Sequence, residues 1–383
     1  MLKKLFRLKK RVRIFLPKSK DIVIFSKTGS EELLQYVISD KFTHSIYDDE
    51  ILTIYLNLKF LIKYFANLIK YRKSSIRLFK YMYLTYILTE FILRNPKIVI
   101  TYIDDHVVYH HLSKILDNIN FIAIQNGTRQ ECHKQLFKNQ EIHHDYYFCF
   151  GVNDIKKQRS FKWYIKNPIP IGSLRAGISL DIFHPQKKIY DICYISEWKK
   201  EYPKTSGLYG KEKSNLRWSD FSKFVDDCIF KFYKKNNVRL VVALRTKLKE
   251  EKEYFLNNFG SNVYFTRSTQ SDSVKKYTNY RSIMQSHVTI GFASTLLVES
   301  LALYTKVLSI DPSESDKYFD YQGSFHYRYS NFDDLEMKIN QLLNSKDINL
   351  QNNSSKYKEA MNIDMKNLPQ EIIKNTLLDI LQK

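Results

Sequence analysis

Cysteine is scarce in this chain of 383 residues, and the few cysteines lie far apart. None belongs to a CxxC pair, and none has the spacing to histidine that marks a structural zinc site. This usage argues against a disulfide framework and is typical of a reducing compartment. We therefore expect a cytoplasmic protein with four reduced thiols, those of Cys132, Cys149, Cys193 and Cys228.

Long apolar runs are also missing. The strongest candidate for a membrane span, Ile51–Lys70, is interrupted by asparagines and lysines, so we expect an amphipathic helix over Leu52–Tyr71 and a second helix over Ser74–Leu93. The apolar run nearest the N-terminus, Val12–Leu16, is too short for a secretory signal. The sequence thus predicts neither a membrane span nor a signal peptide.

Two kinds of binding motif are absent as well. No GxGxxG fingerprint follows a predicted strand, so nothing in the sequence supports binding of NAD or FAD. No DxD pair stands at a strand end, and the adjacent Asp104 and Asp105 lack a spacing that would hold a cation. We expect a protein that needs neither a bound cofactor nor a metal ion.

Positive charge is abundant, with a formal net charge of +21, but lysine is spread along the whole chain. The basic residues do not alternate with aromatic residues on one strand face, so we expect no nucleic-acid partner. Only residues 1–20 concentrate the charge. We expect this segment to contact the anionic inner face of the cytoplasmic membrane without being needed for folding; a solvated, frayed terminus is the alternative. Its basic residues are Lys3, Lys4, Arg7, Lys9, Lys10, Arg11, Arg13, Lys18 and Lys20.

Short apolar runs alternate with helical stretches through most of the chain, which predicts parallel sheets. The length suits two domains. We predict an α/β fold of two Rossmann-like domains over residues 21–178 and 190–348, with Ser179–Ile189 as linker and a last helix within residues 355–383. The expected strands are Asp21–Ser26, His44–Tyr47, Lys97–Tyr102, Phe121–Ile124, Tyr146–Phe150, Ile169–Ile171, Asp191–Ile195, Arg239–Leu244, Asn262–Phe265, His287–Gly291 and Lys306–Ile310.

Polar clusters follow the strands of the first half. Residues 103–106 come after one strand, and residues 125–129 come after the next. Ligands of open α/β sheets bind at the carboxyl ends of the strands, so we expect these loops to line a cleft. Asn126 and Gly127 suit a turn with positive φ. Arg129 either contacts a ligand there or only pairs with a carboxylate.

The segment 287–312 is predicted to form a strand, a tight turn, a helix and a second strand. Ser294 and Thr295 open the helix, and unpaired backbone N–H groups at a helix start suit a phosphate. Glu299 lies one turn later and could accept both hydroxyls of a ribose, so we expect it on the cleft wall, where its loss would barely change stability. The alternative is an N-cap at Ser294 and a solvated carboxylate at Glu299.

The chain resembles GT-B glycosyltransferases, and in particular bacterial surface carbohydrate biosynthesis proteins of capsule and O-antigen loci, in the order of FIAIQNGTR, PIGSLR and VTIGFASTLLVESLALYTKVL. The resemblance spans Lys97–Pro312. It implies two parallel sheets facing across a cleft, a nucleotide-sugar donor in the C-terminal domain and a last helix that returns to the N-terminal domain. The implied activity moves a sugar to a surface polysaccharide or lipopolysaccharide acceptor, which is a glycan or a glycolipid.

The chain differs from the pattern of these glycosyltransferases at the phosphate turn after Gly291. This turn lacks the consecutive glycines common in UDP-sugar enzymes. A donor with one phosphate, such as a CMP-linked ulosonic acid, needs fewer backbone amides. The pair His184-Pro185 is similar to the HP pair of CMP-sugar transferases. A CMP-linked donor is therefore one candidate.

The resemblance also implies roles for residues. It assigns donor binding to Arg245, Lys247, Gly291, Ser294, Thr295 and Glu299, with positive charge stabilising the departing phosphate in place of a metal. We expect the acceptor or the sugar to contact Gln125, Asn126, Gly127, Arg129, Ser173 and Arg175. The candidates for the general base on the acceptor side are Asp104, Asp105, His106, Glu131 and His133.

Two other activities remain open. A polyol-phosphate transferase that uses a CDP-alcohol shares this architecture, but it needs a histidine at the donor edge, whereas His287 stands at a strand start. A basic nucleic-acid-binding protein is the second alternative, and a steep salt dependence of polynucleotide affinity would favour it.

Overall fold

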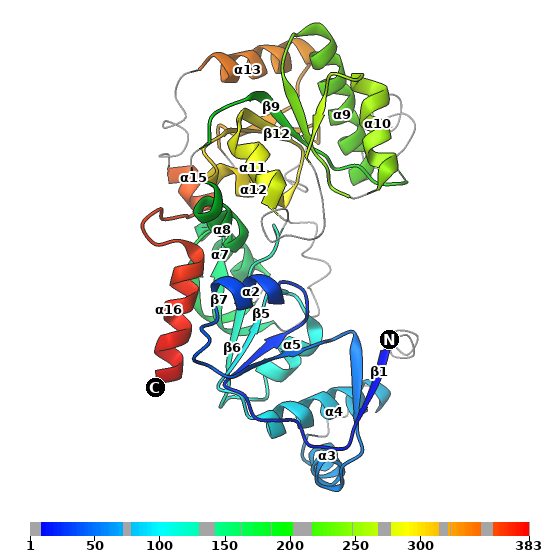
Figure 1. Ribbon diagram of the computed structural model, residues 1–383, viewed down its shortest axis with the longest axis vertical. Coiled ribbons are helices and arrows are strands. Elements are labelled where there is room, and N and C mark those ends of the chain that lie inside the picture. Colours follow the sequence, from blue (N-terminus) through cyan, green and yellow to red (C-terminus); the bar gives the residue numbers. More distant parts are fainter. Residues whose placement is uncertain are drawn as a thin grey trace.

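Two six-stranded sheets, one in each half of the chain, form the framework of the protein. All neighbouring strands within each sheet are parallel, which confirms the predicted α/β fold with two parallel sheets. Figure 1 shows the two domains one above the other. The computed structural model describes residues 9–71, 78–129, 142–161, 163–184, 186–201, 217–246, 248–266, 277–313, 321, 323–345 and 355–382.

The N-terminal sheet has the order β3-β2-β5-β6-β7-β8. Consecutive residues of a strand point to opposite faces, and in β2 Ile22 and Ile24 pack on one side while Val23 and Phe25 pack on the other. Both faces are covered, which explains why the strands are apolar throughout. The strands are β2 Ile22–Phe25, β3 His44–Tyr47, β5 Ile98–Thr101, β6 Asn120–Ile124, β7 His143–Cys149 and β8 Tyr164–Pro170.

Helices pack on both faces of this sheet. The helices α2 (Ser30–Tyr36) and α8 (Leu174–Phe183) contribute to the apolar cluster that contains Ile22 and Ile24. The cluster on the opposite face includes side chains of α4 (Leu78–Arg94) and α5 (Val107–Ser113). The helix α7 (Val152–Ser160) connects β7 to β8. The helices α2, α4, α5 and α7 lie in the crossover connections that parallel strands need, whereas α8 leads from β8 to the C-terminal domain.

The C-terminal sheet has the order β11-β10-β9-β12-β13-β14. In β9, Ile192 and Tyr194 pack in the cluster that includes the helices α9, α10 and α13, whereas Cys193 and Ile195 pack in the cluster shared with α8. The elements of this half are β9 Tyr190–Ile195, α9 Trp218–Lys235, β10 Leu240–Ala243, α10 Lys249–Phe259, β11 Tyr264–Phe265, α11 Thr278–Met284, β12 Ser286–Gly291, α12 Thr295–Glu299, β13 Lys306–Asp311, β14 His326–Arg328 and α13 Phe332–Asn344.

The C-terminal segment runs back along the N-terminal domain (Figure 1). It consists of α15 (Ser355–Ala360) and α16 (Pro369–Gln382), and α16 buries Ile373 and Leu377 in the cluster that contains α8. Gly151 allows α15 to approach closely, because a Cβ atom there would lie 2.1 Å from the carbonyl oxygen of Glu359. The two domains and this segment therefore share one continuous apolar core.

Two local expectations are wrong. Residues 51–55 do not begin a helix but form the strand β4 (Ile51–Tyr55), which pairs in parallel with β1 (Lys9–Arg13). The helix α3 (Leu58–Lys70) begins later, because the side chain of Asn57 accepts hydrogen bonds from the first backbone N–H groups of the helix. That the basic N-terminal segment is not needed for folding stays a prediction. The expected linker is shorter too, because α8 continues to Phe183.

Within the part of the chain that the structure describes, no helix is both long and apolar enough to cross a bilayer.

Candidate functional site

A cavity of about 670 Å³ lies where the carboxyl ends of the strands in the two sheets meet. The N-terminal domain contributes the loop after β6, with Gly127, Thr128 and Arg129. The C-terminal domain contributes the loops that follow β9, β10 and β12. Its lining residues are Ile195, Ser196, Glu197, Lys199, Trp218, Ala243, Leu244, Arg245, Asn279, Ala293, Ser294, Thr295 and Leu296.

Arg245 brings a cation to this cavity, as the sequence led us to expect. Its Nη1 atom donates to Glu197 Oε2 at 3.2 Å, and its side chain is 41% exposed. The buried carboxylate of Glu251 holds the loop in place by accepting hydrogen bonds from the backbone N–H groups of Arg245 and Thr246 at 2.8 and 2.7 Å. The guanidinium group is thus positioned by the loop after β10 while part of it stays accessible to a ligand.

Two cationic side chains lie over the ring of Trp218. The ammonium group of Lys199 lies 4.4 Å from the ring centroid, and the guanidinium carbon of Arg245 lies 5.5 Å from it. Both distances are within the range of a cation–π contact. The half-buried indole therefore holds two cations beside the cavity, where one buried carboxylate, Glu197, faces them.

Glu197 is an unusual acid because it is almost completely buried next to this cavity. Burial raises the pKa of its carboxyl group to about 7, although Arg245 and the hydroxyl of Ser294 favour the ionised form. The charge of the cavity therefore changes near neutral pH. Protonation of Glu197 leaves the charge of Arg245 without its carboxylate partner.

The turn after β12 is more compact than expected. The helix α12 has five residues and continues only as the 3-10 turn Ser300–Ala302. Ser294 and Thr295 both line the cavity, and Thr295 Oγ1 accepts a hydrogen bond of 3.1 Å from the backbone N–H of Thr128 across the domain boundary. Gly291 packs against protein side chains, since a Cβ atom there would lie 3.4 Å from Ile195 Cβ.

Glu299 does not lie on the cavity wall, so the expectation of an exposed carboxylate is wrong. The side chain is 4% exposed and accepts hydrogen bonds from the hydroxyl groups of Ser173 and Tyr280. Burial raises the pKa of Glu299, and the two donors oppose this shift. Because α12 is short and followed by a tight turn, Glu299 points toward α8 and joins the two domains.

Ser173 and Arg175 belong to the same junction and do not line the cavity. Ser173 caps α8 by accepting a hydrogen bond from the backbone N–H of Ala176. Arg175 donates to the buried carboxylate of Glu32 at 3.0 Å and lies over the ring of Tyr102. The turn before α8 thus connects α2, α8 and α12.

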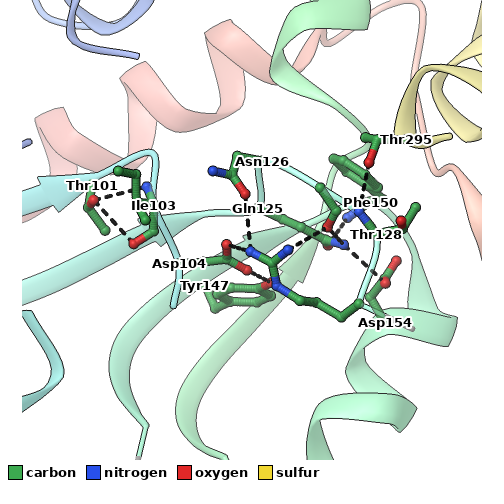
Figure 2. Close-up of polar contacts among 12 residues, drawn as sticks. Thr101, Ile103, Asp104, Gln125, Asn126, Thr128, Tyr147, Phe150, Asp154 and Thr295 are labelled. Carbon is green, nitrogen blue, oxygen red and sulfur yellow. Dashed lines mark hydrogen bonds and ion pairs between the residues drawn. The ribbon is translucent and has the colours of Figure 1, made fainter. Parts of the chain in front are cut away.

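The buried side chain of Gln125 holds the loop after β6 in place through hydrogen bonds (Figure 2). Its amide nitrogen donates to the carbonyl of Gly127 at 2.9 Å and to Asp154 Oδ1 at 3.1 Å, and its amide oxygen accepts from the backbone N–H of Phe150. Gln125 is buried, and neither Gly127 nor Asn126 has the positive φ that we expected. The hydrogen bonds of Gln125, and not a left-handed turn, set the course of this loop.

Arg129 lines the cavity and also forms a buried ion pair with Asp104. Asp104 is fully buried and accepts a hydrogen bond of 2.7 Å from the hydroxyl of Tyr147 (Figure 2). Asn126 Oδ1 accepts from the same guanidinium group at 3.1 Å. Asp104 is therefore not accessible to an acceptor hydroxyl. Arg129 pairs with a carboxylate, as one of the two interpretations of the sequence expected.

Two of the remaining base candidates have different surroundings. His106 caps α5 through Nδ1, which accepts from the backbone N–H of Val108, and its Nε2 atom lies 3.2 Å from Asp49 Oδ2. Both ring nitrogens are thereby engaged. Asp105 is half-buried, and no hydrogen bond or ion pair holds its carboxylate among the described residues. Glu131, His133 and Lys247 lie outside the described residues.

Several residues that line the cavity were not among those predicted from the sequence, above all Glu197, Lys199 and Trp218. The signal for Glu197 was present, because it follows β9 as Arg245 follows β10. Trp218 had no such signal: it begins α9, and only the packing of α9 beside the strand ends brings its ring to the cavity.

Two Rossmann-like parallel sheets whose carboxyl edges share one cavity define a fold of the GT-B type. The chain belongs to the family described as "putative O-antigen biosynthesis protein", whose sequence profile matches residues 122–375. This match confirms the resemblance to bacterial surface carbohydrate biosynthesis proteins. No curated protein sequence matches the chain.

Solved structures confirm the fold. The UDP-GlcNAc 2-epimerase from Neisseria meningitidis bound to UDP-GlcNAc is 13% identical, with a TM-score of 0.53, covering 97% of this chain and 100% of the epimerase chain. The putative UDP-N-acetylglucosamine 2-epimerase from Listeria monocytogenes is 12% identical, with a TM-score of 0.52, covering 96% of this chain and 96% of that chain. At such identities the likeness to these epimerases concerns the fold alone.

Proposed function

We propose that the protein is a glycosyltransferase that moves a sugar from a nucleotide-sugar donor to the acceptor of a surface polysaccharide or lipopolysaccharide. The observation that carries this proposal is the cavity between the two sheets, where cations and hydroxyl groups meet at the strand ends. The family described as "putative O-antigen biosynthesis protein" supports the class of product. An epimerase with the same fold is described as bound to UDP-GlcNAc, which supports a nucleotide sugar as ligand.

The donor phosphate is proposed to bind between Arg245 and the turn that contains Ser294 and Thr295. All three residues line the cavity, and Lys199 adds a second cation. As the bond to the sugar breaks, negative charge develops on the phosphate, and cations fixed in advance stabilise it. Glu299 is not part of this proposal, because its carboxylate oxygens accept hydrogen bonds from Ser173 and Tyr280.

Asp105 is the proposed general base for the acceptor hydroxyl. It follows Asp104 at the carboxyl end of β5, on the side of the N-terminal domain that faces the cavity. A general base must reach the proton that it removes, and among the described base candidates Asp105 is the one whose polar atoms are not engaged by other side chains. Gly127 and Arg129 are placed to contact the transferred sugar or the acceptor.

Replacing Arg245 by Ala tests the donor site. We expect nucleotide affinity to fall by about tenfold or more, because a hydrogen bond to a charged group contributes about 1.5 to 3 kcal/mol. A thermal-shift screen of CMP-, UDP-, GDP-, CDP- and dTDP-linked ligands identifies the nucleotide, since a ligand at a hundredfold excess over its Kd stabilises the folded state by about 3 kcal/mol. Calorimetry then measures the affinity of the variant.

The matched control is Arg239→Ala. Arg239 precedes β10, as Arg245 follows it, and it pairs with the half-buried Asp191 of β9 at the amino ends of the strands. We expect the control to leave nucleotide affinity unchanged. Equal affinities for the two variants would contradict the donor site. A product analysis that finds only free sugar or an epimer, with no sugar on the acceptor glycan, would contradict the transferase itself.

The pH dependence of binding should report on Glu197. Because its pKa is raised to about 7, the carboxylate forms as the pH rises through neutrality and then competes with a phosphate for Arg245. We expect nucleotide affinity to fall above about pH 7 by at most about tenfold per pH unit. Glu197→Gln should remove this dependence, and calorimetry from pH 5.5 to 8.5 on both proteins separates it from titration of the ligand.

The raised pKa of Glu197 also affects the stability of the ligand-free protein. A carboxyl group with a folded-state pKa above its ordinary value of 4.5 binds its proton more tightly in the folded state. The contribution of Glu197 to the free energy of unfolding should therefore decrease as the pH rises from about 4.5 to about 7, and the difference between the unchanged protein and Glu197→Gln measures it. A dependence of binding and stability that persists unchanged in Glu197→Gln would show that another group titrates.

A further inference from the structure

Large apolar side chains are exposed at the outer end of the N-terminal domain, whereas those in the core of the same domain are buried. This end consists of β1, β4, α3 and the start of α4, and it lies remote from the C-terminal domain (Figure 1). No other part of the described chain exposes so many large apolar side chains. The exposed residues of this end are Val12, Ile14, Phe15, Leu56, Leu58, Leu61, Ile62, Phe65, Ile69, Leu78, Phe79 and Met82, with exposed fractions from 37% to 83%.

The helix α3 carries the centre of this surface. At about 100° per residue, Leu58, Ile62, Phe65 and Ile69 fall within a sector of about 60° along one side of the helix. These four side chains are 60% to 80% exposed. The residues that α3 buries in the domain, Phe60, Tyr64 and Asn67, lie in a different sector. The helix therefore has two apolar sides, and the protein covers only one of them.

Within the three segments that carry this surface the charge has one sign, and the carboxylates that directly adjoin them along the chain are those of Asp21, after the first segment, and Glu50, just before β4. Residues 9–20, 51–71 and 78–83 contain no aspartate and no glutamate. On α3, the lysines occupy the flank next to the exposed apolar side. The basic residues of these three segments are Lys9, Lys10, Arg11, Arg13, Lys18, Lys20, Lys59, Lys63, Lys70 and Lys80.

A second feature points to the same kind of partner. A groove of about 520 Å³ opens beside β1, and apolar side chains such as Val12, Ile14 and Phe15 line it together with Arg13, Arg94 and the two lysines Lys18 and Lys20. Arg94 is buried and pairs with Glu90, so the cations available to a ligand are Arg13, Lys18 and Lys20. Apolar walls beside exposed cationic groups suit an amphiphile that has an acyl chain and an anionic headgroup.

We propose that this outer end, formed by β1, β4, α3 and the start of α4, binds the surface of an anionic lipid bilayer, with α3 lying in the plane of the interface. The exposed side of α3 would enter the boundary between headgroups and acyl chains, and the flanking lysines would contact anionic headgroups. This placement moves the membrane contact that we expected of residues 1–20 to a folded surface. It does not depend on the transferase assignment, because lipid binding needs no donor and no acceptor.

The test is vesicle binding by the full-length protein. We expect the protein to sediment with vesicles of phosphatidylglycerol and phosphatidylcholine, and to bind pure phosphatidylcholine at least about tenfold less tightly. Binding to the mixed vesicles should weaken as the salt concentration rises. The double variant Phe65→Glu/Ile69→Glu should lose at least about tenfold in binding to the mixed vesicles, because it places two carboxylates where the helix enters the interface.

The matched control is Met337→Glu, which changes an apolar residue of α13 that is 55% exposed in the C-terminal domain. The control should bind mixed vesicles as the unchanged protein does, and the melting temperatures of both variants should stay close to that of the unchanged protein. A second variant, Lys59→Gln/Lys63→Gln/Lys70→Gln, should bind more weakly only to the anionic vesicles.

Two results would overturn the proposal. The first is equal binding of Phe65→Glu/Ile69→Glu and Met337→Glu to mixed vesicles. The second is self-association: if light scattering shows that the unchanged protein is a dimer and that Phe65→Glu/Ile69→Glu is a monomer, the exposed side of α3 is an interface between two copies of the chain.

Discussion

Asp104→Ala should destabilise the protein by about 3 to 5 kcal/mol. Asp104 is fully buried and pairs with Arg129, so its removal leaves a guanidinium group buried without its countercharge. The hydroxyl of Tyr147 loses its acceptor as well. Urea unfolding followed by circular dichroism measures the loss. A fall in activity of this variant would then reflect the collapse of the loop after β6, and not the loss of a general base.

Neighbouring substitutions separate the two carboxylates. Asp105→Ala changes a half-buried carboxylate that forms no hydrogen bond or ion pair among the described residues, so it should alter stability by no more than about 0.5 kcal/mol while lowering sugar transfer. Asp104→Ala/Arg129→Met should be more stable than Asp104→Ala, because the unpaired charge is gone. If Asp104→Ala melts like the unchanged protein and yet loses transfer, Asp104 is the base and the buried ion pair has been misjudged.

Glu299→Ala is expected to cost about 2 to 5 kcal/mol of stability. Two buried hydroxyl groups, those of Ser173 and Tyr280, lose their common acceptor, and each buried donor without a partner costs about 1 to 3 kcal/mol. Since Ser173 begins α8 and Glu299 ends α12, the loss falls on the junction between the domains. Chemical denaturation measures it, and proteolysis in the native state should show faster cleavage between the domains.

The control for Glu299 is Glu253→Ala. Glu253 is also a helical glutamate, but it is exposed and pairs only with Lys249 one turn earlier, so its loss should cost no more than about 0.5 kcal/mol. Glu299→Gln keeps one oxygen and should lie between the two. Unchanged stability of Glu299→Gln together with a tenfold loss of nucleotide affinity would restore the ribose-binding role that the sequence suggested.

Much of the fold could be read from local patterns. Strands such as β2 and β5 are short apolar runs because helices cover both of their faces, and such runs can be recognised in the sequence before their packing partners are known. The polar residues that follow strands were also placed correctly at one edge, because parallel strands deliver their carboxyl ends to the same side. This is why Arg245, Ser294 and Thr295 could be proposed for one cavity before the structure was known.

Periodicity was less informative at the outer end of the N-terminal domain. Residues 51–55 and α3 are both rich in apolar residues, and only the pairing of β4 with β1 separates a strand from the following helix. The helical pattern of α3 was visible in the sequence. Which of its two apolar sides is covered depends on contacts with residues far away, and therefore on the tertiary structure.

By itself, the sequence determined the class of fold, the edge at which the cavity lies and one cation at that edge, Arg245, because these follow from strand and helix patterns that act over a few residues. Only the tertiary structure decided which polar side chains face the cavity and which form hydrogen bonds or ion pairs with neighbouring residues instead. Asp104 and Gln125 follow strand ends and Glu299 ends α12, yet each is buried against a residue 19 or more positions away, such as Tyr280 for Glu299. A buried carboxylate or amide needs such a partner to offset its lost hydration, and the chain's path through space, not the local sequence, supplies it.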